Sequence, residues 1–149
     1  MIMKKVVWTA LIAGVVLVAG LRASDAMEAI VRSYLDVQSR LASDKVEGIA
    51  PAARAIAAQA ARMGEGGAAI AKSAQALEQA ADIKAARKAF GDLSDAVIAA
   101  AKAEGWKDLP DVKVAFCPMA NRSWIQKEDS IRNPYYGTSM LTCGSFTKK

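Results

Sequence analysis

The chain has 149 residues, a length typical of one domain, and a formal net charge of +5. It contains no histidine. This absence excludes Cys-His and Ser-His nucleophile pairs and any zinc site that needs imidazole, and no spacing of carboxylates marks an acid-base pair. We therefore expect no enzyme activity. No basic run or stripe of arginines occurs, so nucleic-acid binding is not expected either.

The first 23 residues have the features of an export signal. Met1–Lys5 carries two lysines, and Val6–Leu21 is apolar and uncharged. The apolar segment is shorter than the roughly 20 residues that a transmembrane helix needs. Residues 1–23 are therefore predicted to be a signal peptide, with an uncleaved membrane anchor as the alternative. In either case residues 24–149 would form a single exported, periplasmic domain.

Helical periodicity follows in an alanine-rich segment. A first helix is expected over residues 25–41 with Asp25 as its cap, and a second over residues 44–63. Pro51 either kinks the second helix or marks its true start, because proline lacks a donor and fits best in a first turn. Gly64–Gly67 predicts a break.

Two further helices are expected before the composition changes. One covers residues 68–80, and the strongest begins after Asp82 as its cap and ends at Gly105. Short connections predict a mainly α fold, an up-and-down bundle of about four helices over residues 24–105. The same apolar spacing also fits a coiled-coil partner.

Residues 106–149 are expected to form a small, aromatic-rich cap. They hold six of the nine aromatic residues and both cysteines. Val112–Phe116 predicts one short strand, Asn133–Gly137 has the residues of a turn, and Ser139–Phe146 is expected to return as a second strand. The cap would therefore contain two short strands, and function should be sought there.

The two cysteines allow two interpretations. In an exported protein an even number of cysteines indicates a disulfide, and a Cys117–Cys143 bridge would contribute about 3 kcal/mol in the chain-entropy model. Alternatively, thiolate and thioether ligands select Cu(I), and Cys117, Met119, Met140 and Cys143 would supply such a set. The two interpretations exclude each other at any one moment, because an oxidised pair offers no thiolates.

Three aromatic residues near the cysteines also have two interpretations. Trp124, Tyr135 and Tyr136 could form a surface for a ligand or a protein partner. Such a cluster could equally be the core of a small cap.

The tail resembles a known family. Its sequence CPMANRSWIQKEDSIRNPYYGTSMLTCG, from Cys117 to Gly144, is similar to that of the bacterial domain-of-unknown-function 3347 family, and RKAFGDLSDAVIAAAK at Arg87–Lys102 is similar to the family's alanine-rich helices. The resemblance implies an exported module, related to segments of periplasmic adaptor subunits in copper and other heavy-metal efflux systems. A metal-efflux component or another periplasmic protein is then the expected partner, and Cu(I) the expected metal. Ala120 stands where metal-binding modules of those systems often have histidine, and this departure weakens the transfer of ligand roles.

Overall fold

The computed structural model describes the backbone of residues 11–109 and 111–149, and side chains from residue 23 onward within those ranges. It contains these elements in chain order: α1 (Leu11–Ala42), α2 (Ile49–Ala61), η1 (Gly64–Gly67), α3 (Ala68–Glu78), α4 (Ile83–Ala103), β1 (Lys113–Cys117), β2 (Arg122–Gln126), η2 (Gly137–Met140) and β3 (Ser145–Thr147). The predicted mainly α fold with a small strand-containing cap is confirmed.

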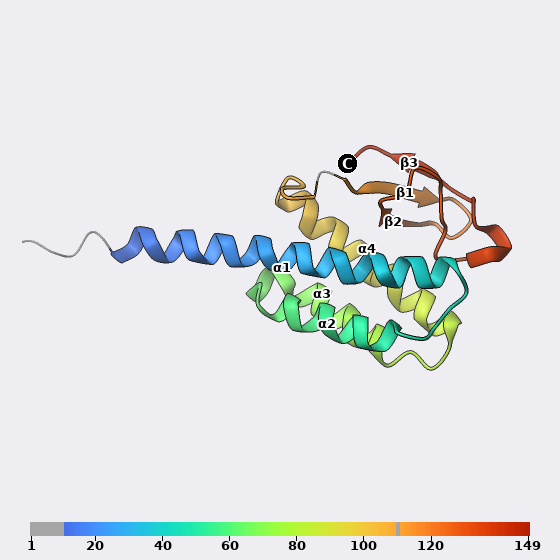
Figure 1. Ribbon diagram of the computed structural model, residues 1–149, viewed down its shortest axis with the longest axis horizontal. Coiled ribbons are helices and arrows are strands. Elements are labelled where there is room, and N and C mark those ends of the chain that lie inside the picture. Colours follow the sequence, from blue (N-terminus) through green and yellow to red (C-terminus); the bar gives the residue numbers. More distant parts are fainter. Residues whose placement is uncertain (1–10, 110) are drawn as a thin grey trace, which may run out of the picture.

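The four described α-helices pack in chain order, α1 on α2, α2 on α3 and α3 on α4. The N-terminal part of α1 extends beyond the other helices (Figure 1). The helix runs through Asp25, which therefore does not cap it as expected. No helix in the described part of the chain is long and apolar enough to cross a membrane. The export signal expected at residues 1–23 falls largely outside what is described, since residues 1–10 and the side chains of 11–22 are not covered.

The ends of α2 and α4 follow local chemistry. The helix α2 starts at Ile49, which places Pro51 in its first turn, where the missing N–H costs nothing. Asp82 caps α4 as predicted, because its Oδ1 accepts a hydrogen bond of 2.7 Å from the N–H of Ala85. Beyond α4, Gly105 has a φ of +66°, and the next N–H, of Trp106, donates to the carbonyl of Ala101. This geometry is a Schellman motif, which needs a left-handed residue at that position.

The sheet differs in detail from the expected hairpin. Its strand order is β2-β1-β3, with β1 antiparallel to both neighbours. The sequence pattern did not reveal β2, which pairs Ala115 with Trp124 across the turn that follows β1. The expected second strand at 139–146 is reduced to β3, because the chain forms the short helix η2 first. The described residues thus hold three strands where two were predicted.

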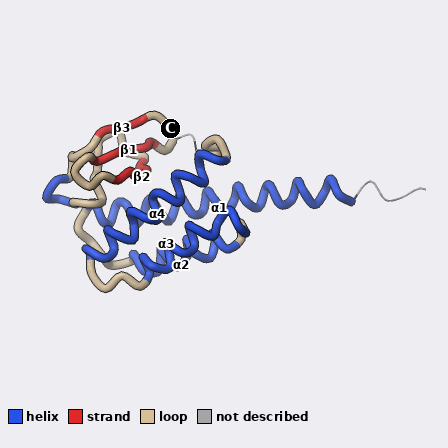
Figure 2. The backbone as a smooth tube through the Cα atoms, turned by 180° about the vertical axis from the view of Figure 1, so that it is seen from behind, coloured by secondary structure: helices blue, strands red, loops and turns tan. Residues whose placement is uncertain are grey.

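The tail and the helices share one hydrophobic core. Figure 2 shows the strands together along one side of the helices, on the side of α1 and α4 away from α2 and α3. The rings of Tyr34 on α1 and Phe90 on α4 lie 4.8 Å apart, and Tyr135 lies 5.9 Å from both Phe90 and Trp124. Tyr34 also accepts a hydrogen bond of 3.2 Å from the N–H of Ile125 on β2. These contacts position the tail, and with it the cysteines, against the bundle.

Candidate functional site

The two cysteines lie together at the end of the sheet. Cys117 is the last residue of β1, and Cys143 lies in the loop between η2 and β3. Their Sγ atoms are 3.0 Å apart, and both are thiols. The side chain of Cys117 is fully buried, whereas that of Cys143 is partly exposed. Residues 26 positions apart thus meet at a single point.

Asn133 holds the loop that carries Cys143. Its buried side chain donates from Nδ2 to the carbonyl of Cys143 at 2.7 Å and accepts at Oδ1 from the N–H of Tyr135 at 2.8 Å. Its own N–H donates to the carbonyl of Leu141 at 2.7 Å. The Asn-Pro-Tyr-Tyr-Gly turn and the Met-Leu-Thr-Cys segment therefore form one hydrogen-bonded unit. Sequence reasoning took Asn133 only as a turn residue. An asparagine side chain has both a donor and an acceptor, so it can form hydrogen bonds with its own turn and with a second segment at once, and this property could have indicated the role of Asn133.

Gly144 allows the loop to reach the sheet. Its φ of +131° is a conformation that side-chain-bearing residues rarely adopt. A Cβ there would lie 2.8 Å from the carbonyl oxygen of Phe116 and 2.9 Å from Cη2 of Trp124. A glycine after Cys143 is therefore required for the two sulfur atoms to approach.

The surroundings of the two thiols are unequal. Burial raises the pKa of Cys117, but the hydrogen bond with the Cys143 thiol, followed by that from the N–H of Ala120, outweighs burial and lowers that pKa overall. The hydrogen bond that Cys143 makes to Cys117 raises the pKa of Cys143. The N–H of Ala120 lies 3.4 Å from the Cys117 sulfur. When the pair loses one proton, the remaining thiol donates to the thiolate and stabilises it.

The geometry of the pair suits a disulfide without large movement. A disulfide bond is about 2.05 Å long, so the two sulfur atoms need to approach by only about 1 Å. At a metal–sulfur bond of about 2.3 Å, sulfur atoms 3.0 Å apart would subtend only about 80° at a metal. A metal held by both cysteines would therefore require them to separate.

The two predicted methionine ligands are not buried with the cysteines. The side chain of Met119 is 65% exposed and that of Met140 is 37% exposed. Each is close in sequence to a cysteine, two positions after Cys117 and three before Cys143. Within the described residues, no group of three or more Cys, Asp or Glu side chains is arranged to hold a metal ion. A site with four sulfur ligands would require both methionine side chains to turn inward.

The three aromatic residues Trp124, Tyr135 and Tyr136 differ in exposure. Trp124 is fully buried, and its Nε1 donates to Oε1 of the buried Gln126 at 2.9 Å. Tyr135 packs edge-on against Trp124, its hydroxyl donates to the carbonyl of Ser123, and burial raises its pKa well above the usual value. Tyr135 and Tyr136 are both partly exposed. Trp124 is therefore an interior residue, because the strand that carries it faces α1 and α4.

A second polar cluster, which the sequence did not indicate, fastens η2 to the bundle. Asp44 accepts hydrogen bonds from the hydroxyl and the N–H of Thr138 and from Arg87 on α4. The Thr138 hydroxyl, followed by Arg87, lowers the pKa of Asp44 to about 2. Arg87 also donates to the carbonyl of Pro134 at 3.0 Å. A Cβ on Gly137, whose φ is +58°, would lie 2.0 Å from Oδ1 of Asp44, so a larger residue would displace the Asp44 carboxylate.

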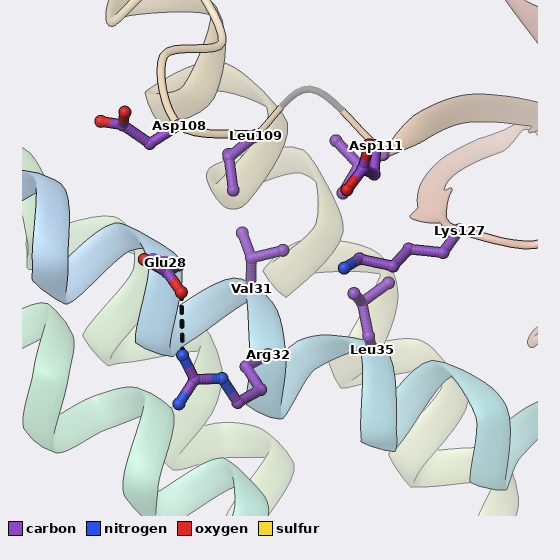
Figure 3. A pocket seen from close by; sticks show the side chains of 9 residues that line it. Glu28, Val31, Arg32, Leu35, Asp108, Leu109, Asp111 and Lys127 are labelled. Carbon is purple, nitrogen blue, oxygen red and sulfur yellow. Dashed lines mark hydrogen bonds and ion pairs between the residues drawn. The ribbon is translucent and has the colours of Figure 1, made fainter.

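A pocket of about 600 Å³ lies between α1 and the segments that flank the sheet. Its floor is apolar, and its rim carries charges of both signs; the lining residues are Glu28, Val31, Arg32, Leu35, Asp108, Leu109, Asp111, Val112 and Lys127. Figure 3 shows Glu28 and Arg32 paired along α1, and Lys127 extending from the end of β2 toward the α1 side. Because the rim has no dominant charge, it does not favour a strongly anionic or cationic ligand.

A family model described as Protein of unknown function (DUF3347) matches residues 30–108. The chain belongs to this family. The matched residues run from α1 to the turn after α4. Both cysteines lie outside that match, so the site described above belongs to a part of the chain that the family model does not cover. Searches of curated proteins and of solved structures found no match.

Proposed function

We propose that this protein is an exported, non-enzymatic accessory domain of the periplasm that binds a protein partner, and that a Cys117–Cys143 disulfide within its tail joins the end of β1 to the loop before β3. The observation that carries the proposal is the 3.0 Å separation of two sulfur atoms on distant segments. The loop that presents Cys143 is held by Asn133 in the position that a bridge needs.

The disulfide would have a structural purpose. Residues 106–149 contain three short strands, and the last has only three exposed residues, so this segment has little regular structure of its own. A bridge across 26 positions would stabilise the fold by about 3 to 4 kcal/mol in the chain-entropy model. Disulfides persist in oxidising compartments, which agrees with the export signal expected at residues 1–23.

A second candidate function is binding of a soft metal, Cu(I), by the reduced pair. The observation that favours it is the lowered pKa of Cys117, because the thiolate is the metal ligand. Two exposed thioether side chains, Met119 and Met140, are close in sequence to the cysteines and are of the type that Cu(I) prefers. In this case the partner would be a component of metal efflux.

One experiment separates the two functions. The exported domain is purified without reductant, its free thiols are counted, and it is then reduced under anaerobic conditions and titrated with Cu(I) against a competing chelator. No free thiols as isolated, and no copper held after reduction, is the result expected for the disulfide. Two free thiols and one copper, lost in Met119→Leu or Met140→Leu, would establish the metal site instead. Met63→Leu is the matched control, because Met63 lies in the turn after α2 and outside the tail.

A further inference from the structure

We propose that Cys143 is the sulfur at which an incoming thiolate attacks the Cys117–Cys143 disulfide, so that the domain exchanges its disulfide through a mixed disulfide at Cys143. This inference rests on the proposed function and deepens it, since it assigns a modification site and the chemistry of the partner. The attacking group is a thiolate, from a small thiol or from a protein dithiol.

The burial of the two sulfurs determines which one can be reached. Thiol–disulfide exchange requires the attacking thiolate to approach one sulfur of the bridge, so access decides the site. Cys117 ends the central strand of the sheet and has no exposed surface. Cys143 is partly exposed and lies in a loop whose neighbours, Thr142 and the residues of η2 from Thr138 onward, are exposed. An attacking group therefore meets Cys143 first.

The surroundings of Cys117 suit the departing sulfur. The N–H of Ala120 points at its sulfur from 3.4 Å, and this N–H belongs to the tight turn between β1 and β2. An N–H donor at this distance stabilises the thiolate that departs. A thiol of lower pKa leaves faster in exchange. Access and leaving ability thus favour the same direction of reaction.

The reaction balances without any further reagent. The incoming thiolate forms a bond to Sγ of Cys143, the bond between Cys143 and Cys117 breaks, and its electron pair departs on Sγ of Cys117 as a thiolate. A second thiol attacks the mixed disulfide and releases Cys143. The net reaction converts two external thiols into one external disulfide and leaves two protein thiols.

The test uses the full domain, oxidised in vitro with diamide, which takes up two electrons and two protons from the thiol pair. The oxidised protein is exposed briefly to reduced glutathione, quenched with acid, alkylated with N-ethylmaleimide and digested with trypsin. The two cysteines fall in separate peptides, Val114–Arg122 and Asn133–Lys148, because of the basic residues at 113, 122, 132 and 148. We expect at least tenfold more glutathione on the peptide of Cys143, with the alkyl group on that of Cys117.

A second arm replaces glutathione with a Cys-X-X-Cys protein whose second cysteine is serine, so that the mixed disulfide is trapped. This protein should also attach at Cys143. Its rate and that of glutathione are compared at equal thiolate concentration, and the faster reaction shows whether a protein dithiol or a small thiol is the natural partner. This inference would be overturned if glutathione or the Cys-X-X-Cys protein attached at Cys117, or attached equally to both peptides. The proposed disulfide would stand in either case. If diamide produces no bridge within the chain, the proposed function fails, and this inference fails with it.

A variant measurement checks access without a bridge. Cys117→Ser leaves only Cys143, and Cys143→Ser leaves only Cys117. With oxidised glutathione we expect the Cys117→Ser variant to be modified at least ten times faster than the other. Equal rates, in variants with unchanged circular dichroism, would contradict the difference in access.

Discussion

The two sides of the molecule are held together by different kinds of contact. The hairpin of α2 and α3 packs aliphatic side chains, such as Ala53, Ile56 and Ala74, and a surface pair, Arg54 with Glu78, links the two helices. The side formed by α1, α4 and the sheet packs large rings and joins them with buried hydrogen bonds, including that of Tyr34 to Ser94 at 2.6 Å. Periodic apolar contacts position helices, but an irregular tail needs specific partners at each turn.

The largest expected effect is that of removing the central ring of the tail. Trp124→Ala should lower the free energy of unfolding by about 3 to 5 kcal/mol, because it leaves a large cavity and frees the buried amide of Gln126. Val46→Ala, at an exposed position, is the control and should change stability by less than about 0.5 kcal/mol. Urea unfolding of both variants measures the difference. A Trp124 variant as stable as the control would show that the aromatic side is not the core.

Removal of the proposed bridge should have the next largest effect. Cys117→Ser together with Cys143→Ser should lower the free energy of unfolding by about 3 to 4 kcal/mol relative to the unreduced protein. The double variant should be much closer in stability to the reduced wild-type protein, since neither has a bridge. Denaturant unfolding with and without reductant provides the comparison. An unreduced wild-type protein no more stable than its reduced form would contradict the stabilising role.

The clamp on the cysteine loop should contribute less than the bridge. Asn133→Ala leaves the carbonyl of Cys143 and the N–H of Tyr135 without their partner and should cost about 1 to 3 kcal/mol. It should also slow closure of the bridge after reduction, since the loop is no longer held beside β1. Asn133→Asp keeps the acceptor for Tyr135 and loses the donor to Cys143, so it should close the bridge as slowly as Asn133→Ala. Closure at the wild-type rate in both variants would refute the clamp.

The smallest expected effect is a dependence of stability on acid. The pKa of Asp44 falls from its usual 3.8 to about 2 in the fold, first through the Thr138 hydroxyl and then through Arg87. A lowered pKa contributes stability that is present above about pH 3.8 and is lost as the pH falls toward 2. Unfolding measured between pH 5 and about pH 2 should therefore show a shallower decline in Asp44→Asn than in the wild type. Asp129→Asn, at a fully exposed carboxylate with a pKa lowered only by Lys113, is the control and should change the slope less. If stability fell equally steeply with pH in the wild type and in Asp44→Asn, the Asp44 cluster would not contribute to stability as described.

The helices were predictable because their signals are local. Asp82 caps α4, Pro51 falls in the first turn of α2, and the seam of α4 contains Phe90, Leu93 and Val97 as buried residues. Each of these depends on neighbours within one or two turns, which a sequence pattern records. The start of α1 was missed because an acidic residue such as Asp25 is tolerated on the exposed side of a longer helix.

The tail was less predictable because its contacts are distant in sequence. The strand β2 was missed, since Arg122 and Gln126 mask its apolar pair of Trp124 and Ile125. The roles of Asn133 and Asp44 depend on partners that no spacing identifies, such as Thr138 for Asp44. The expected pairing of two strands anticipated that Cys117 and Cys143 lie close together. In the fold, β1 pairs with β3, which begins after Cys143 and is shorter than the expected second strand at 139–146.

The most direct test of the account is a peptide map of the exported domain isolated without reductant. Alkylation followed by trypsin should yield one linked species that joins Val114–Arg122 to Asn133–Lys148, and this species should separate into its two peptides on reduction. That result would place the bridge between Cys117 and Cys143 in the protein as it exists. Two separate peptides, each alkylated on its cysteine, would contradict the claim that the cysteines form a disulfide. The metal-binding function would then be the remaining candidate.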